Sequence, residues 1–466
     1  MPLSEMSRLL PKDRKLRKWV ITVLIITFLL VASLMIYSVI QIALHLFRLL
    51  FKNLSLFMST VEGNYTQVNT TIPYENEYVN TGGAMNLTTG VFRAPIAGTY
   101  VFNFNAPRYS SDQNVPLCLN VRMDLNNLPV ANGPICGYSY EKWTEASLVA
   151  VLDLKQNDTV GVYLQQGEIR GDYSVRSNHS HTHFTGFLMY EKSAFHAFRT
   201  NDSFASRRND TVPFHGVNTN VGSNFDLETS TFTAPINGTY YFQFIGSSST
   251  TTDVNLQKND VELMGYGYTR SMHWGSAGFH SLWQLQEGDK VCTKLAMGKL
   301  EEASKESKIT NLVGFLVAEE EYDSFNTSVY FHVARTSGLY AGNNNKLVVN
   351  YTVVHSNEGD GMNAASGIFK APQPGIYAFH FTAHKGTGYI SPMDSCSTVI
   401  QMHNNLTIGV GSNCDMTYSA PIFFHSILHL EIDDEIKMVM TEGDMMGADH
   451  YNESARFSGY LIYPDE

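Results

Sequence analysis

The sequence predicts an all-β chain of three tandem sandwich domains preceded by one transmembrane helix. Three observations lead to this prediction. The turn signature F-x-A-P-x-x-G-x-Y occurs three times, short strand-like runs alternate between apolar and polar residues, and Gly, Pro and Asn separate these runs. Many short alternating strands with such turns, and almost no helical periodicity, indicate β-sandwiches.

The spacing of the turn signature sets the number of domains. Its prolines, Pro95, Pro235 and Pro372, lie 140 and 137 residues apart, which is the length of a complete domain and far longer than a solenoid repeat. We therefore divide the chain into a cytosolic tail (1–18), a transmembrane helix (19–47) and three domains (48–192, 193–320 and 321–466).

Each turn signature leads into a predicted strand with one aromatic face, and two further landmarks follow in the same order. The strands are Tyr100–Phe104, Tyr240–Phe244 and Tyr377–Phe381. The second landmark is an apolar strand and a turn whose central residue favours a left-handed backbone, namely Asn157, Gly288 and Asp433. The third is a short apolar strand at Phe184–Leu188, Leu312–Leu316 and Phe457–Leu461.

In this order and spacing, the three motifs resemble the globular head domain of complement C1q, and the resemblance covers nearly everything after about Phe57. It implies a jelly-roll fold similar to tumour necrosis factor and assembly into compact trimers. The chain departs from collagen-bearing members, because its 35 glycines are scattered and no Gly-x-y tract exists. The stalk that trimerises those members is therefore absent from this sequence.

An apolar run from Trp19 to Phe47 is long enough to cross a bilayer as a helix. Basic residues crowd its N-terminal side, and Arg48 and Lys52 are the only ones just beyond it; the N-terminal set is Arg8, Lys12, Arg14, Lys15, Arg17 and Lys18. The positive-inside rule then predicts a type II plasma-membrane protein with an uncleaved signal-anchor and an extracellular C-terminal part. The alternative, a cleaved signal peptide, has an apolar region of about 7–15 residues.

Two further patterns concern traffic and glycosylation. Glu5, Leu9 and Leu10 form an acidic dileucine-like pattern typical of sorting signals, although such patterns are common by chance. Sequons for N-glycosylation are dense and dispersed, which suits an extracellular surface. They are Asn53, Asn64, Asn69, Asn86, Asn157, Asn178, Asn201, Asn209, Asn237, Asn326, Asn350, Asn405 and Asn452.

The cysteines predict two disulfides. Cys118 and Cys136 are 18 residues apart, and so are Cys396 and Cys414, and each pair is centred on an Asn-rich turn. Residues equidistant from a hairpin turn face each other within disulfide reach, so we expect both bridges to form outside the cell. The second domain has Thr251 and Thr269 at the positions that we take as equivalent.

Cys292 is left over as an unpaired thiol. Its strand places it on the face opposite Val291 and Leu295, and thus outside the expected core. It either pairs between chains or faces a domain contact, or it is a plain thiol shielded by a neighbour. Its position leaves these alternatives open.

No catalytic constellation is found, and we predict that the chain is not an enzyme. His179, His181 and His183 alternate along one strand, where nearly 7 Å between neighbours makes convergence on one metal poor. We interpret them as a solvated polar face. Asp433, Asp434 and Glu435 offer oxygens suited to calcium, but ordinary turn chemistry explains them first.

No cofactor is therefore assigned, calcium stays open as an alternative, and any metal ligands stay unknown. Four methionines near the C-terminus are interpreted as core and loop packing: Met438, Met440, Met445 and Met446. The net charge of −12 makes nucleic acid an unfavourable partner.

The linkers between domains are short. Tyr190 closes the first domain and Phe195 already begins the second, so the connection spans only about 15–20 Å at about 3.5 Å per residue. This favours neighbours around a common axis. Our hypothesis is that the three heads of one chain form an intramolecular pseudo-trimer; the alternative is a homotrimer of three chains.

Two functions remain. The first is a cell-surface recognition or adhesion protein that binds an extracellular protein or glycan ligand through trimeric heads. The alternative is a membrane-tethered signalling ligand of the tumour necrosis factor type. Both functions fit the sequence, because binding loops vary while the scaffold that carries them does not.

Overall fold

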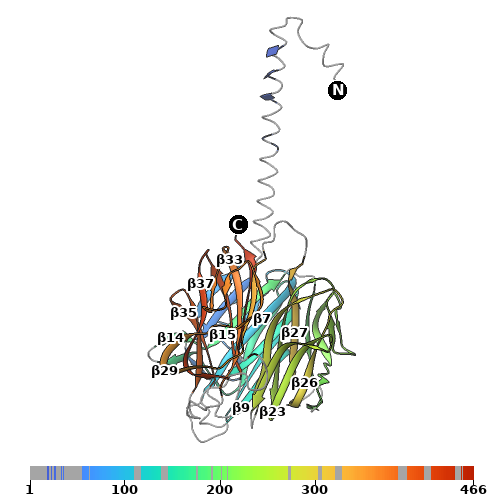
Figure 1. Cartoon of the computed structure of the whole chain (residues 1–466), viewed down its shortest axis with the longest axis vertical. Coiled ribbons are helices and arrows are strands. Elements are labelled where there is room, and N and C mark those ends of the chain that lie inside the picture. The colour runs from blue at the N-terminus through green and yellow to red at the C-terminus, as the bar shows by residue number, and fades with distance from the viewer. Residues whose placement is uncertain are drawn as a thin grey trace. The chain divides into compact units, whose positions relative to one another are not determined.

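The computed structural model describes residues 55–465, except for 62, 110–116, 138–144, 175–176, 190–192, 201, 207, 271–273, 303–306, 321–327, 387–395, 414–420, 447–452 and 454. N-terminal to these it describes isolated helical residues, which are Lys18, Trp19, Thr22, Val23, Ile26, Thr27, Ser33 and Met35. Ser55–Glu466 forms one compact unit, separate from Met1–Leu54 (Figure 1). Within these described residues, no helix has the length and apolar character needed to span a membrane. Most of the expected transmembrane helix, and the dileucine pattern, lie outside the described residues.

The first domain is built of short antiparallel strands. They are β1 (Leu56–Val61), β2 (Asn64–Tyr65), β3 (Thr70–Thr71), β4 (Asn76–Thr81), β5 (Met85–Asn86), β6 (Val91–Arg93), β7 (Gly98–Tyr109), β8 (Leu117–Leu125), β9 (Leu128–Gly137), β10 (Glu145–Leu154), β11 (Thr159–Gln166), β12 (Glu168–Arg170), β13 (Asp172–Ser174), β14 (Ser177–Ser180) and β15 (Thr182–Met189). One sheet has the order β2-β12-β7-β15-β1-β4 with β10 added to β7, and the other has the order β5-β6-β11-β8-β9 with β3 added to β11.

The second and third domains repeat this plan. The second contains β16 (Ala194–Phe198), β17 (Phe204–Ser206), β18 (Asp210–Thr211), β19 (Gly216–Val221), β20 (Phe225–Asp226), β21 (Thr231–Thr233), β22 (Gly238–Ser248), β23 (Thr251–Lys258), β24 (Glu262–Arg270), β25 (Gly275–Leu285), β26 (Lys290–Leu300) and β27 (Asn311–Glu319). The third contains β28 (Tyr330–Arg335), β29 (Leu339–Val348), β30 (Val353–Glu358), β31 (Met362–Asn363), β32 (Ile368–Lys370), β33 (Gly375–His384), β34 (Ser397–His403), β35 (Leu406–Asn413), β36 (Pro421–Leu430), β37 (Glu435–Met445) and β38 (Ala455–Pro464).

In every domain the first and last strands pair with each other in one sheet, which we call the inner sheet. Its order is β19-β16-β27-β22-β25 in the second domain and β30-β28-β38-β33-β36 in the third. The other, outer sheet has the order β20-β21-β26-β23-β24 in the second domain and β31-β32-β37-β34-β35 in the third. This confirms the prediction of three tandem all-β sandwiches.

The repeated motifs have local physical causes. The tyrosine that ends each turn signature donates a hydrogen bond back to a carbonyl of the same turn: Tyr100 to Ile96 at 3.0 Å, Tyr240 to Ile236 at 2.9 Å and Tyr377 to Gln373 at 2.7 Å. The predicted left-handed turn residues have positive φ angles of 73° at Asn157, 88° at Gly288 and 67° at Asp433. Both turns are therefore specified by short-range chemistry.

Aromatic rings fill the space between the two sheets of each domain. In the third domain, Phe331 stacks on Phe369 at 5.0 Å and meets Phe457 edge-on at 5.0 Å. The glycine of the last-strand motif makes room for these rings, because a Cβ at Gly459 would lie 2.5 Å from the ring of Phe331. A Cβ at Gly186 of the first domain would likewise lie 2.6 Å from Phe57.

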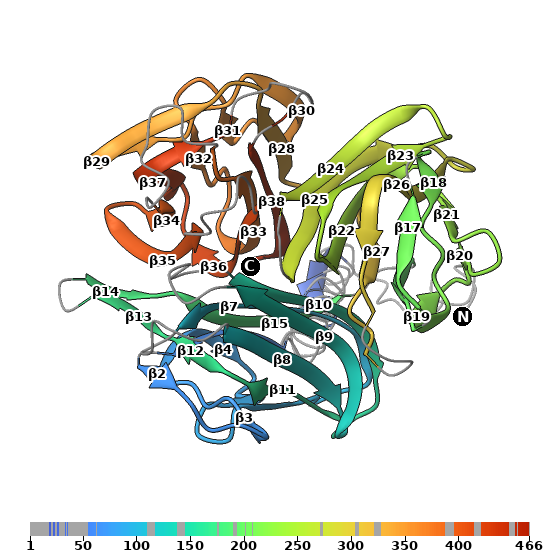
Figure 2. The ribbon, with the colours of Figure 1, turned by 90° about the horizontal axis from the view of Figure 1, so that it is seen from below.

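Figure 2 shows the three sandwiches side by side around a common centre, with β7, β10, β22, β25, β33 and β38 on the sides that face it. The burial of the inner strands agrees with this arrangement. Every residue of β22, β25 up to Leu282 and β33 is buried. A strand that packs on only one face shows alternating burial, so these strands are covered on both faces. A neighbouring domain covers the second face of each of these strands.

Candidate functional site at the interfaces between domains

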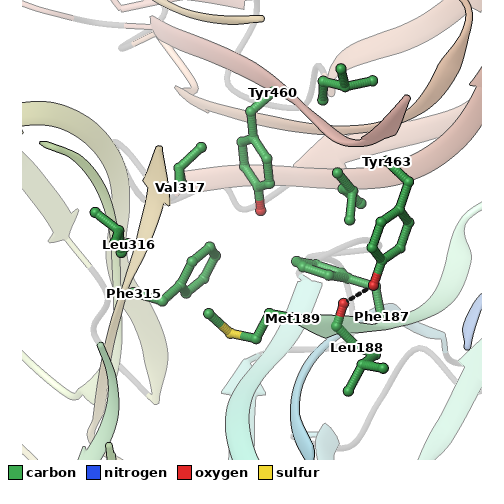
Figure 3. A pocket seen from close by; sticks show the side chains of 10 residues that line it. Phe187, Leu188, Met189, Phe315, Leu316, Val317, Tyr460 and Tyr463 are labelled. Carbon is green, nitrogen blue, oxygen red and sulfur yellow. Dashed lines mark hydrogen bonds between the residues drawn. The ribbon is translucent and has the colours of Figure 1, made fainter. Parts of the chain in front are cut away.

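Three aromatic residues of the last strands meet where the domains converge (Figure 3). The ring of Phe187 lies 6.3 Å from that of Phe315 and 6.4 Å from that of Tyr460, and Phe315 and Tyr460 are 6.2 Å apart. They occupy the same position of the last-strand motif in the three domains. The Tyr463 hydroxyl donates to the Leu188 carbonyl, which joins the third domain to the first beside this cluster.

The aromatic cluster borders a small cavity of about 120 Å³. Its lining comes from the last strands of all three domains: Phe187, Leu188, Met189, Phe315, Leu316, Val317, Tyr460, Leu461, Ile462 and Tyr463. Burial of these side chains requires all three domains, so each domain contributes to the stability of the others.

The second–third interface is dominated by hydrogen-bonded polar side chains. The Tyr241 hydroxyl lies 3.0 Å from His380 Nδ1, and His380 Nδ1 lies 2.7 Å from His425 Nδ1. His280 of the second domain places Nδ1 2.7 Å from the Thr382 hydroxyl of the third. In the other direction, Arg456 Nη1 donates to the Tyr266 carbonyl at 2.9 Å.

Burial controls the protonation of these imidazoles, because removal from water disfavours the charged form. It lowers the pKa of His280, His332 and His380 well below the ordinary value of 6.5. Burial and the nearby His183 lower the pKa of His425 to about 3. The second–third interface is therefore electrically neutral at these positions at pH 7.

The first–third interface contains a buried carboxyl group. Glu145 Oε1 accepts a hydrogen bond from the Ser412 amide at 2.7 Å, and Oε2 accepts from the Phe423 amide at 3.4 Å. Burial outweighs these bonds and raises the pKa of Glu145 to about 8. Nearby, Asn105 Nδ2 donates to the Phe423 carbonyl at 3.0 Å.

The first–second interface is joined largely through backbone groups. The Cys136 amide donates to the Trp274 carbonyl at 2.8 Å, and Asn218 Nδ2 donates to the Val130 carbonyl at 3.0 Å. His196 lies beside this contact, with its Nε2 3.0 Å from Asn311 Oδ1. Burial lowers the pKa of His196 to about 4.

The interpretation of His181 and His183 as a solvated face is wrong. Their exposed fractions are only 1% and 3%. The ring of His183 meets Phe424 of the third domain edge-on at 5.0 Å and packs against Gly409, where a Cβ would lie 2.3 Å from it. The third domain thus takes the place of solvent here. The three histidines also do not share one strand, because His179 lies in β14, His183 lies in β15 and His181 lies between these strands. The side chain of His179 lies outside the described residues.

Sequence reasoning missed most of this interface. Asn103, Gln243, His380 and Thr382 alternate with core aromatic residues along the inner strands, in the pattern of a solvated face, yet all are buried. The available signal was the kind of polar residue. These positions carry amides, hydroxyls and imidazoles, whereas solvated strand faces are rich in Lys, Glu and Asp.

The disulfide prediction is confirmed for the first domain. Cys118 and Cys136 are cross-strand partners on β8 and β9 with a Cα–Cα distance of 4.1 Å and a sulfur–sulfur bond. Cys396 is also disulfide-bonded, while Cys414 lies outside the described residues. The neighbouring pair Ser397 and Asn413 is in the register that the predicted bridge requires.

The proposed equivalence of Thr251 and Thr269 is wrong by one residue. Thr269 pairs with Thr252, and Thr251 pairs with Arg270. The cause is the turn. Strand β23 ends at Lys258 and β24 begins at Glu262, which leaves three residues between them, whereas two residues separate β8 from β9 and β34 from β35. One additional turn residue shifts the pairing along the hairpin.

Cys292 carries a free thiol that is 6% exposed. It lies outside the apolar core cluster of its domain, as its strand phase predicts, and its Sγ is 3.7 Å from Asp260 Oδ1. Burial raises its pKa, so the thiol is protonated at neutral pH.

The carboxylates of Asp434 and Glu435, in the acidic turn of the third domain, already have protein partners. Asp434 Oδ2 lies 2.9 Å from His403 Nε2, Oδ1 accepts from Asn404 Nδ2 at 2.9 Å, and Glu435 pairs with Lys370 at 3.1 Å. Among the described residues, the only group of metal-ligand atoms within 4.8 Å of one another is the exposed trio His429, Glu431 and Asp465. Met438, Met440 and Met445 are buried, which confirms their interpretation as packing residues.

Every sequon asparagine with a described side chain is exposed. These are Asn64, Asn69, Asn86, Asn157, Asn209, Asn237, Asn350 and Asn405. The side chains of Asn53, Asn178, Asn201, Asn326 and Asn452 lie outside the described part. A glycan at any of the exposed positions would displace no packed side chain.

The fold and the mutual burial of inner sheets define a class of protein: jelly-roll sandwiches that associate by threes. The C1q domain family model matches residues 56–189, 194–317 and 330–462, and the chain therefore belongs to the C1q domain family. The chain is 29% identical over 138 residues to complement C1q tumor necrosis factor-related protein 3 of human and of mouse. That match covers 29% of this chain and 51% of each relative, so the chain spans about half the length of the curated relatives it matches.

Solved structures are also similar to part of this chain. The globular domain of zebrafish complement 1qA protein matches at 21% identity, over 29% of this chain and 98% of that chain, with a TM-score of 0.22. Murine APRIL matches at 12% identity, over 29% of this chain and all of that chain, with a TM-score of 0.23.

Proposed function

We propose that this chain is a cell-surface recognition protein whose three C1q domains form one complete head. The observation that carries the proposal is the mutual burial of the three inner sheets within a single chain. It leaves the ends of the outer hairpins, at Leu128, Val261 and Leu406, facing solvent, where loops on a rigid scaffold commonly bind ligands. The function is binding of an extracellular protein or glycan.

The location completes this proposal. The apolar run 19–47, with basic residues on its N-terminal side, would anchor the chain as a type II plasma-membrane protein. The exposure of the described sequons supports an extracellular head, because oligosaccharyl transfer requires accessible asparagines.

A binding screen tests the function. The full chain in detergent would be probed against glycan and protein arrays, in calcium and again in a chelator. We expect specific binding to a small set of ligands that persists in chelator, because the acidic turn of the third domain is satisfied by protein groups. Absence of binding together with receptor activation on cells would instead support the signalling alternative.

A further inference from the structure

A row of imidazole rings crosses the second–third interface. Successive ring centroids are 5.0 Å apart from His355 to His332, 6.2 Å to His280, 6.0 Å to His380 and 4.9 Å to His425. His280 belongs to the second domain, and its ring lies between two rings of the third. Separation of these two domains would therefore release the middle of the row into water.

The charged groups around this row cannot neutralise several imidazolium ions. Arg456 on β38 is a cation near both His280 and His332. The Glu453 carboxylate already has two hydrogen-bond donors, which are His355 Nε2 at 2.7 Å and Arg456 Nε at 2.8 Å. Among the described residues, the remaining ionisable neighbours with a contact to the row are the hydroxyls of Tyr241 and Tyr460 and, from the first domain, His183. None of these supplies a negative charge at neutral pH.

The hydrogen bonds of the row fit neutral rings. His280 Nδ1 contacts the Thr382 hydroxyl, and His332 Nδ1 contacts the Ser458 hydroxyl at 2.7 Å. Within the described residues, the Nε2 atoms of both rings are buried and have no hydrogen-bond partner. An imidazolium carries a proton on both nitrogens, so protonation would leave a buried, unpaired N–H on each ring.

We propose that this histidine row makes the second–third interface acid-sensitive: on acidification the imidazoles protonate, the second and third domains separate, and their binding surfaces are rearranged. Adjacent imidazolium rings repel each other and Arg456, and separation restores their hydration. This acid-induced separation builds on the proposed recognition function, because a cell-surface protein can pass through acidic compartments. The separation itself does not depend on which ligand is bound.

The sign of the pH dependence follows from the direction of the pKa shifts. His280, His332 and His380 have pKa values lowered by burial in the closed head, whereas hydration in the open head moves these pKa values towards 6.5. The closed state therefore keeps its full stability above about pH 6.5 and loses it as the pH falls below that value.

The other two interfaces respond differently. Glu145 at the first–third interface has a raised pKa, so its contribution is fully present below its ordinary value of 4.5 and is lost as the pH rises through about 8. Acid therefore strengthens that contact. The first–second interface contains His196, a single imidazole whose pKa is lowered. The row of five rings makes the second–third interface the one that opens first.

Three exposed turn residues can report each interface separately. Leu128, Val261 and Leu406 lie at or beside the turn of the equivalent outer hairpin in the three domains, with exposed fractions of 70%, 86% and 72%. For each interface, the two residues that belong to its two domains would be changed to cysteine in the full chain carrying Cys292→Ser, and both cysteines would be spin-labelled. Pulsed electron spin resonance would then measure the distance between the two labels at about pH 7.5 and about pH 5.5.

We expect a longer, reversible Val261–Leu406 distance population at the acidic pH, while the Leu128–Leu406 distance keeps its value. The variant His280→Asn/His332→Asn retains an amide near each Nδ1 position but cannot titrate. Since each histidine contributes about tenfold to the opening constant between these two pH values, the double variant should lose about 100-fold of the pH effect.

The exposed His429→Asn change is the matched control and should leave the acid response unaltered. A wild-type Val261–Leu406 distance that is the same at both pH values would overturn the proposal, as would an equal lengthening of all three distances. An unchanged acid response in the double variant, with the wild-type distance kept at about pH 7.5, would also overturn it.

Discussion

Glu145 shows how one side chain can couple two domains. The carboxyl group belongs to Glu145, the first residue of β10 in the first domain, and its two hydrogen-bond donors are backbone amides of the third domain. Backbone amides cannot move without moving their sheet, so the side chain fixes the relative position of both domains. Its raised pKa means that the protonated acid is the form that fits best.

Glu145→Gln tests this at the residue scale. The amide resembles the protonated acid, so at pH 5 we expect the free energy of unfolding to stay within about 1 kcal/mol of wild type. As the pH rises towards 8, wild type loses stability at up to about 1.4 kcal/mol per pH unit and the variant does not. Thermal unfolding at several pH values measures the difference.

The control is Glu431→Gln, an exposed carboxyl group in a turn of the third domain, which should show no such divergence. If the Glu145→Gln and wild-type curves stayed parallel from pH 5 to pH 8, then the carboxyl group would be ionised and hydrated in the folded head, contrary to its burial.

At the scale of elements, the outer hairpin is the most variable part of the repeat. The first domain closes it with a disulfide, whereas the second has threonines as cross-strand partners at Thr252 and Thr269 and a turn one residue longer. A change of one residue in a turn moves every cross-strand pair beyond it. Matching hairpin residues of different domains by counting from the turn therefore gives the wrong cross-strand pairs wherever the turns differ in length.

This register predicts where a new disulfide can form. Thr252→Cys/Thr269→Cys joins direct cross-strand partners, and we expect it to oxidise and to raise stability by about 2–4 kcal/mol, less any loss from the Thr252 hydrogen bonds. Thr251→Cys/Thr269→Cys joins residues out of register and should stay reduced. Intact mass before and after alkylation distinguishes the two; a bridge in the second variant alone would contradict the register.

At the scale of the whole molecule, the inner sheets determine what the unit of function is. Each domain buries amides, hydroxyls and imidazoles against two neighbours from its own chain, and the aromatic residues Phe187, Phe315 and Tyr460 complete the centre. Three different contacts can be matched separately within one chain, whereas a homotrimer must repeat the same pair of patches at every contact.

Native mass measurement tests this assembly. We expect the full chain in detergent, after removal of glycans, to have the mass of one 52.1 kDa chain over a wide range of concentration. A stable particle of three chains would mean that the heads prefer their counterparts on other chains. The reduced and alkylated protein is the control that excludes linkage through Cys292.

Much of the fold could be predicted because its signals are short-range. The turn signatures, the left-handed positions at Asn157, Gly288 and Asp433, and the glycine beneath the core rings depend on neighbours in sequence or on one packed layer. The disulfide of the first hairpin was predicted from equal spacing about Asn127, and this register arises from the two-residue turn together with the bulge between Met123 and Asp124. Periodicity also located the aromatic core face of each inner strand.

The site itself was hidden from such reasoning. His181, His183 and His380 occupy positions where alternation predicts water, and only the neighbouring domain shows that they are buried. The sequence by itself determined three aromatic-cored sandwiches of one family, because local turns and strand periodicity carry that information. Only the tertiary structure decided which polar faces meet, which imidazoles are shielded and which carboxyl is held protonated, because desolvation depends on surfaces brought together from distant parts of the chain.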